Sequence, residues 1–165
     1  MVAITLPDGS IKKFERPITG QALAQSIGAG LAKAAVAVKV DGEQRDLSSE
    51  ICDDAHVSIL TAKDEDGLDI LRHSMAHILA QAVKELYPEA QITIGPVIEH
   101  GFYYDISFPN SISADDLEII EKRMHNIVDE DLPISREVWG REHAVKAFEA
   151  EGEHYKAEII RDLPD

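Results

Sequence analysis

The sequence is poor in cysteine and in long apolar runs, and each shortage excludes a class of protein. Its 165 residues include one cysteine, Cys52, so an internal disulfide is excluded and a reducing compartment is expected. No apolar run approaches the roughly 20 residues that a membrane-spanning helix needs, and the first residues lack the basic and apolar regions of a secretory signal. With 44% hydrophobic and 28% charged residues, the composition is that of a globular protein. We therefore expect a cytoplasmic globular protein.

Basic residues are also scarce, and the imbalance is uneven. The chain has 16 Lys and Arg against 31 Asp and Glu, a net charge of −15. Residues 1–62 hold 6 basic and 8 acidic residues (−2), and residues 63–165 hold 10 and 23 (−13). This acidity repels nucleic acid at long range. Charge alone therefore argues against an RNA-binding protein, and any RNA is expected to be held mainly by other parts of a larger protein.

The first 62 residues have the element order of a β-grasp, ubiquitin-like domain. Pro7-Asp8-Gly9-Ser10 is a turn signal between strands predicted at 2–6 and 11–15, because Pro presets φ and Gly tolerates a positive φ. Thr19 is a predicted N-cap for a helix over 21–27, which Gly28 or Gly30 would end. Strands are predicted at 35–40 and 56–61, the first of them followed by a tight turn at Asp41-Gly42.

A second domain is predicted over 63–165, because residues 63–67 form a charged connector. The longest helix is expected at 68–86, before Pro88. Two strands, at 92–98 and 102–108, are expected to meet at Glu99-His100-Gly101. Ser113 to Asp116 is a near capping box that opens a second helix. The remaining predicted elements are a strand at 134–139, a helix at 141–151 ended by Gly152, and the start of another element after 155. The fold class is α+β, with a mixed or antiparallel sheet in this second domain.

His73 and His77 carry the most suggestive chemistry in the long helix. Their spacing of four places both imidazoles on one helix face, about 40° apart. An apolar stripe is expected to pack on the opposite side, so the histidines would face solvent or a cleft; it consists of Leu68, Leu71, Met75, Ile78, Leu79, Ala82 and Leu86. Two merely solvated histidines remain an alternative. Zinc is a weaker one, because Ser74 stands where metalloproteases have Glu and two histidines are too few ligands; we assign no metal.

Several segments resemble one family, the threonyl-tRNA synthetases of bacterial type. Leu6-Pro7-Asp8-Gly9-Ser10 and the junction at 59–64 resemble its TGS domain. Its editing domain is resembled by three further segments: Arg72 to His77, residues 94–98 with 101–105, and Glu121-Lys122-Arg123-Met124. The editing domain of alanyl-tRNA synthetase shares the two histidines, but usually without a TGS domain in front. The resemblance runs along the whole chain in unbroken order, and implies an N-terminal region made of a TGS domain and an editing domain.

The resemblance also implies roles for particular residues. His73 and His77 match the two helix histidines of the pocket that cleaves the aminoacyl ester, and Lys156 matches a lysine of the same pocket. Tyr104, Gly95 and Pro96 match positions that would bind the substrate. By strand alternation alone Tyr104 would face the core, and Lys156 alone would be an ordinary surface lysine. The family continues with an Asp-x-Cys-x-x-x-His segment that this sequence lacks, so we expect an incomplete editing domain with impaired activity.

The implied function is proofreading of a tRNA. A threonyl-tRNA synthetase attaches threonine to tRNA(Thr) using ATP, Mg and a zinc ion, all in a catalytic part with no counterpart here; no cofactor is expected in this chain. The region seen here would hydrolyse mischarged Ser-tRNA(Thr) at the 3′ end of the tRNA. We expect this chain to be a monomer and the whole enzyme a homodimer. Two alternatives stay open: a non-catalytic module that binds tRNA or a partner, and a zinc-dependent editing hydrolase of the alanyl type.

Overall fold

The computed structural model describes residues 1–134 and 137–164, which form two compact units. The first is Met1–Arg72 and the second is His73–Asp165, so the division falls inside helix α3 (Glu65–Leu86). The domain boundary expected after residue 62 stays a prediction. In the part of the chain that the structure describes, no helix is both long enough and apolar enough to cross a bilayer.

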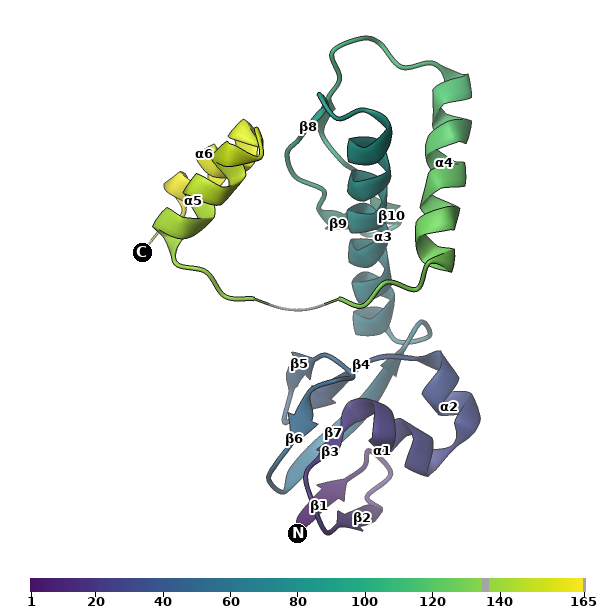
Figure 1. The fold of residues 1–165 in the computed structure, drawn as a ribbon. Coiled ribbons are helices and arrows are strands. Elements are labelled where there is room, and N and C mark those ends of the chain that lie inside the picture. The colour runs from purple at the N-terminus through teal and green to yellow at the C-terminus, as the bar shows by residue number, and fades with distance from the viewer. Residues whose placement is uncertain (135–136, 165) are drawn as a thin grey trace. The chain divides into compact units, whose positions relative to one another are not determined.

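The first unit contains a five-stranded mixed sheet, and the helices of this unit lie beside the sheet (Figure 1). Strand order is β2-β1-β7-β4-β5, with β1 parallel to β7 and the other pairs antiparallel. A second ladder pairs β3 with β6. The bounds are β1 Val2–Thr5, β2 Ile11–Phe14, β3 Ile18–Thr19, α1 Gly20–Ile27, α2 Ala29–Ala34, β4 Ala35–Val40, β5 Glu43–Arg45, β6 Glu50–Ile51 and β7 Ala55–Thr61. This arrangement confirms the predicted β-grasp fold.

Local chemistry explains most of these boundaries. The Thr19 hydroxyl accepts a hydrogen bond from the Ala22 N–H at 3.2 Å and so caps α1 as predicted. Gly28 ends α1, but the chain re-enters a helix at once, so α2 was missed. The strands and α1 share one core of buried apolar side chains, formed by Val2, Ile4, Leu23, Val38, Val40, Ile51 and Val57. Burial of this set holds β1, α1, β4, β6 and β7 together.

Gly67, in the first turn of α3, is a position where any side chain would be costly. An added Cβ would lie 2.7 Å from the carbonyl carbon of Thr61 and closer still to its oxygen, and a backbone group cannot swing aside. We expect Gly67→Ala to destabilise the chain by about 1–3 kcal/mol in chemical denaturation. Gly30→Ala is the matched control, because a Cβ there meets nothing within 4 Å and alanine favours a helix. Equal effects of the two substitutions would contradict this reading.

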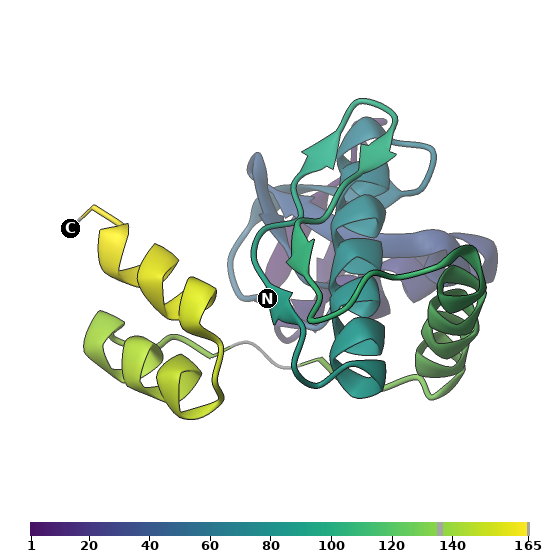
Figure 2. The ribbon, with the colours of Figure 1, turned by 90° about the horizontal axis from the view of Figure 1, so that it is seen from above.

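The second unit packs a broken hairpin and α4 (Ala114–Asp129) against α3 (Figures 1 and 2). The hairpin has four short strands: β8 Gln91–Ile92, β9 Val97–Ile98, β10 Gly101–Phe102 and β11 Ile106–Ser107. Its core contains Ala82, Val83, Ala90, Ile92, Ile120 and Ile127. The continuous strands predicted at 92–98 and 102–108 are thus wrong, since each is interrupted in its middle.

The interruption is a bulge in the first strand of the hairpin. Val97 pairs with Phe102, and continuing that register would place Ile106 opposite Thr93. Ile106 instead pairs with Ile92, so the first strand holds one extra residue. Irregular backbone bonds bridge the gap, including one from the Asp105 N–H to the Ile94 carbonyl at 3.0 Å.

The buried face of α3 differs from the predicted stripe. Leu68, Met75 and Leu86 of that stripe are exposed, whereas Ala82 is buried as predicted, together with Ala76 and Val83, which lie outside the stripe. Residues of the hairpin and of α4 share one core with α3, so the helix packs against more than one element. The helix also begins at Glu65, inside the segment expected to be a connector.

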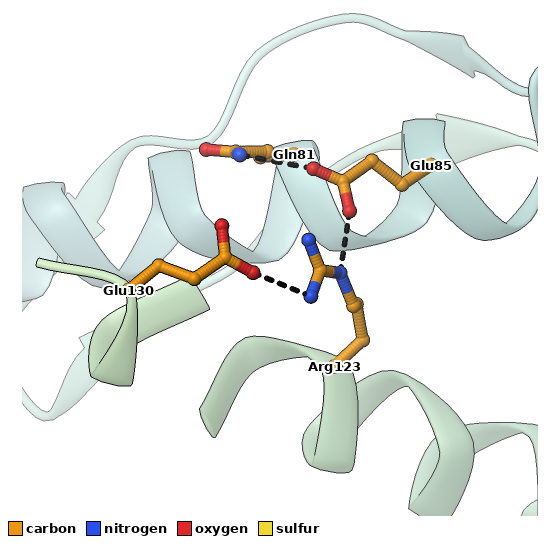
Figure 3. Close-up of polar contacts among 4 residues, drawn as sticks. All are labelled: Gln81, Glu85, Arg123 and Glu130. Atoms are coloured by element: carbon orange, nitrogen blue, oxygen red, sulfur yellow. Dashed lines mark hydrogen bonds and ion pairs between the residues drawn. The ribbon is translucent and has the colours of Figure 1, made fainter. Parts of the chain in front are cut away.

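Helix α4 begins as its sequence predicts and is tied to α3 by an arginine. Ser113 and Asp116 form a full reciprocal capping box. Arg123 donates to Glu85 of α3 and, at 2.8 Å, to Glu130 at the end of α4, while Gln81 donates to Glu85 at 3.0 Å (Figure 3). These pairs are partly exposed, so each contributes little to stability, and the Arg123–Glu85 pair is the one that joins α4 to α3.

The last part of the unit is a helical hairpin. The strand predicted at 134–139 is wrong for Ile134 and residues 137–139, which are irregular, while residues 135–136 lie outside the described residues. Helix α5 (Arg141–Ala150) and helix α6 (His154–Asp162) are joined at Gly152, whose φ of +75° suits glycine. The Glu153 N–H donates to the Phe148 carbonyl at 2.8 Å, and α6 contacts β8. The element expected in the tail is therefore α6.

Candidate functional site

His73 and His77 form a direct imidazole pair on α3. Their Nε2 atoms are 2.8 Å apart and their ring centroids 4.6 Å apart, with the planes inclined at 56°. One ring must donate and the other accept, so the pair can carry at most one proton beyond its neutral state. In the neutral pair the donor ring holds its proton on Nε2, which leaves its Nδ1 with a free lone pair. The pair thus offers one basic nitrogen, on whichever ring acts as the donor.

The surroundings of His77 favour its neutral form. Partial burial of the ring, followed by the charges of His73 and Lys156, lowers the pKa of His77 below its ordinary 6.5. The side chain is still reachable from solvent. A neutral, accessible imidazole at physiological pH is the state that a general base needs.

Tyr104 lies against Gly95 at the bulge of the hairpin. A Cβ on Gly95 would be closer than 3.0 Å to three atoms of the Tyr104 ring, so only glycine lets the ring lie there. Tyr104 also packs against the core of the unit, as strand alternation predicted. Burial, and to a smaller extent the charge of Glu153, raises the pKa of Tyr104, so its hydroxyl stays protonated and can donate a hydrogen bond. Pro96 contributes its carbonyl, which accepts from the Tyr103 N–H at 3.4 Å.

Lys156 projects from the first turn of α6 toward the same region. Its ammonium is 3.8 Å from Oε2 of Glu153 and 5.5 Å from the centroid of the Phe148 ring. Its charge acts on His77, as the lowered pKa of that histidine records. The structure therefore pairs His73 with His77 and couples His77 electrostatically to Lys156, and Tyr104 to Glu153.

Glu153 is a site residue that the sequence did not reveal. It is 4% exposed, and its Oε1 forms an ion pair with the Lys84 ammonium at 2.7 Å. Lys84 also donates to the carbonyls of Pro88 at 2.8 Å and Ala90 at 3.0 Å. A glutamate that follows the glycine ending a helix gives no sign of burial, because its position depends on how α6 packs against β8.

The charge of this region opposes that of the unit around it. Lys84 and Lys156 carry two positive charges against the one negative charge of Glu153, which leaves a net positive charge in a strongly acidic half of the chain. Such a local charge suits an anionic or developing negative group. Among the described residues no three His, Cys, Asp or Glu side chains are placed to share a metal ion, so the donors here do not fit zinc.

Three further histidines of the second unit, His100, His125 and His143, lie on its surface. His100 is exposed at the hairpin tip, 3.7 Å from Glu99, and His125 is exposed on α4. His143 is exposed on α5, where its ring meets that of Trp139 edge-on at 4.7 Å. These positions suit surface residues, as predicted from their sequence context.

Comparison with known proteins gives matches along the whole chain. Residues 2–61 match the TGS domain family. The threonine–tRNA ligase of Aromatoleum aromaticum is 57% identical over 164 residues, which is 99% of this chain and 26% of that protein. Those of Ralstonia nicotianae and Rhodospirillum rubrum are 57% and 56% identical, again over 26% of their length. The chain thus spans about a quarter of the length of these relatives. Threonine–tRNA ligase is another name for threonyl-tRNA synthetase, so the predicted resemblance to that family is confirmed.

Proposed function

We propose, from its place among the threonine–tRNA ligases, that this chain supplies the proofreading step of such an enzyme: hydrolysis of the ester in Ser-tRNA(Thr). The observation that carries the proposal is the His73–His77 pair at 2.8 Å, beside the charge of Lys156. An ester linking an amino acid to ribose needs an activated water and a stabilised oxyanion. The pair and the lysine supply one group for each task.

The reaction follows from the protonation states of these groups. The free nitrogen of the neutral pair accepts a proton from water as the water oxygen attacks the carbonyl carbon of the ester. The ammonium of Lys156 stabilises the oxyanion that forms, or holds the 3′ end of the RNA. The C–O bond to ribose then breaks, and the imidazole proton passes to the leaving ribose oxygen. The products are serine and uncharged tRNA.

A separate hydrolytic pocket has a physical reason in this family. Serine is threonine without one methyl group, so it fits wherever threonine fits. A difference of that size gives a binding pocket only about 1–3 kcal/mol of discrimination. A second pocket that admits serine and clashes with the threonine methyl removes the remaining error. Tyr104, fixed over Gly95, is our candidate for a wall of that pocket.

The reaction that attaches threonine to the tRNA is assigned to other parts of the enzyme. Attachment of threonine with ATP and Mg, and the zinc of the catalytic part, belong to regions of the relatives that this chain does not span. The chain would act in the cytoplasm on tRNA(Thr), joined to the rest of the synthetase, with dimerisation through that remaining part. No residue of this chain is proposed to hold ATP or a metal ion.

The pH dependence of hydrolysis follows from His77. Because its pKa is lowered, His77 stays neutral at its ordinary value of 6.5 and gains a proton only at more acidic pH. The enzymatic rate should therefore be level near neutral pH and fall on acidification, with a midpoint below 6.5. Lys156→Met removes one cause of the lowering and should move the midpoint upward. A rate profile from pH 5 to 7.5, corrected for uncatalysed hydrolysis, checks both; an unmoved midpoint would contradict the assignment.

The proposal is tested by incubating this chain with Ser-tRNA(Thr) and Thr-tRNA(Thr), beside the full-length Aromatoleum aromaticum ligase. We expect faster loss of serine than of threonine, at a rate below that of the full-length enzyme and unaffected by a chelator. Binding of tRNA without hydrolysis would instead favour a non-catalytic module. Loss of activity with the chelator, restored by zinc, would favour the alanyl type of editing hydrolase.

A further inference from the structure

We propose that Glu153 is a positioning residue that holds the ammonium of Lys156 in place. The inference rests on the proposed function for its kinetic test, but its structural basis is separate. Glu153 joins two lysines from different helices through its two oxygens, Lys84 of α3 at 2.7 Å and Lys156 of α6 at 3.8 Å. It therefore links the helix that carries the histidines to the helix that carries the lysine.

The burial of Glu153 requires such compensation. Its carboxylate is almost completely covered, and Oε2 makes no hydrogen bond within the described residues. A buried carboxylate costs several kcal/mol unless charge or hydrogen bonds offset the loss of water. The ammonium of Lys84 pairs with Oε1, and Oε2 faces the ammonium of Lys156. The negative charge on Oε2 therefore attracts the Lys156 ammonium without competition from a hydrogen-bond donor.

Lys84 fixes the direction of this pull. Its ammonium forms an ion pair with the Glu153 carboxylate and donates hydrogen bonds to the carbonyls of Pro88 and Ala90. Lys84 therefore holds Oε1 against the start of the hairpin, and the carboxylate cannot turn without breaking a charged contact. Oε2 is thereby kept on the side of Lys156.

Lys156 is held from two directions but not saturated. The Phe148 ring lies 5.5 Å from its ammonium and offers a weak cation–π contact, while Oε2 attracts it electrostatically. At 3.8 Å the approach to Oε2 is too long for a hydrogen bond. The N–H groups of Lys156 thus remain available for a substrate oxygen. An arrangement that fixes the charge and leaves its donors available is what a positioning carboxylate should produce.

A double-mutant cycle tests this role in the full 165-residue chain. Glu153→Gln keeps the shape and an acceptor for Lys84 but removes the charge, and we expect it to slow Ser-tRNA(Thr) hydrolysis by about tenfold. Lys156→Met should slow it more, and the double variant should match Lys156→Met alone. A merely structural glutamate would give equal losses in both backgrounds, which would overturn the proposal. If Glu153→Gln fails to fold, Glu153→Asp is used instead, because its shorter side chain keeps the charge but places it farther from Lys156. The same changes in rate are expected.

A second readout does not depend on activity. Acylation of lysine amines by a succinimide ester, followed by mass spectrometry, reports how freely Lys156 moves. Glu153→Gln should raise the labelling rate of Lys156 by at least about threefold relative to Lys146, which is exposed on α5. Unchanged relative labelling would overturn the positioning role. If the wild-type chain proves inactive while labelling changes as expected, the hydrolytic function fails and the positioning stands.

Discussion

Replacing His77 by alanine is expected to lower hydrolysis of Ser-tRNA(Thr) by about 10²–10⁴-fold, the usual contribution of a positioned general base. The substitution removes one ring of the pair, and with it the hydrogen bond between the two Nε2 atoms. Folding should change little, because both side chains are exposed. Initial rates at neutral pH, with circular dichroism as a check on folding, give the measurement.

Two comparisons sharpen this test. His73→Ala should cause a loss of similar size, and the double substitution should cost little more than either alone, since the rings act as a unit. His125→Ala, on the exposed face of α4, is the matched control and should leave the rate unchanged. A His77→Ala variant that retains its rate would remove the pair from the chemistry.

Replacing Gly95 by alanine is expected to damage the site and its supporting hairpin together. The new methyl group would overlap the Tyr104 ring, so either the ring leaves its place or the bulge opens. We expect a loss of about 1–3 kcal/mol in the free energy of unfolding and a fall in hydrolysis of about 10²-fold from the displaced wall. Denaturation curves and initial rates on the same protein measure the two effects.

Two control variants distinguish the effect of the added methyl group from the contribution of the Tyr104 side chain. Gly140→Ala adds the same methyl where nothing lies within 4 Å, and should leave the rate unchanged. Tyr104→Phe keeps the ring and removes only its hydroxyl, so it tells whether that hydroxyl touches the substrate. Wild-type rates in Gly95→Ala would mean that the position of Tyr104 does not matter for hydrolysis.

Local sequence signals predicted much of the fold correctly. Thr19 and Ser113 cap their helices because a hydroxyl at that position bonds the first free N–H groups, a rule that needs no tertiary information. The turn at Asp41-Gly42 likewise follows from residues that tolerate positive φ. The His73–His77 pair was foreseeable too, since a spacing of four on a helix leaves little choice of geometry.

The features that were missed depend on packing between elements. The apolar stripe predicted on α3 includes Met75, which is exposed, and omits Ala76 and Val83, which are buried, because the hairpin and α4 both pack against this helix. The bulge near Gly95 adds a single residue that alternation cannot reveal. Glu153 is buried by contacts of α6 with β8 and Lys84, which lie far from it in sequence.

The most direct test of the account is release of labelled serine from Ser-tRNA(Thr) by excess protein, in a single turnover. The 165-residue chain would be compared with its His73→Ala/His77→Ala variant and with buffer alone. If the histidine pair activates the attacking water, the chain releases serine faster than buffer and the variant does not. Equal release by the chain and the variant would contradict the assignment of hydrolysis to this pair.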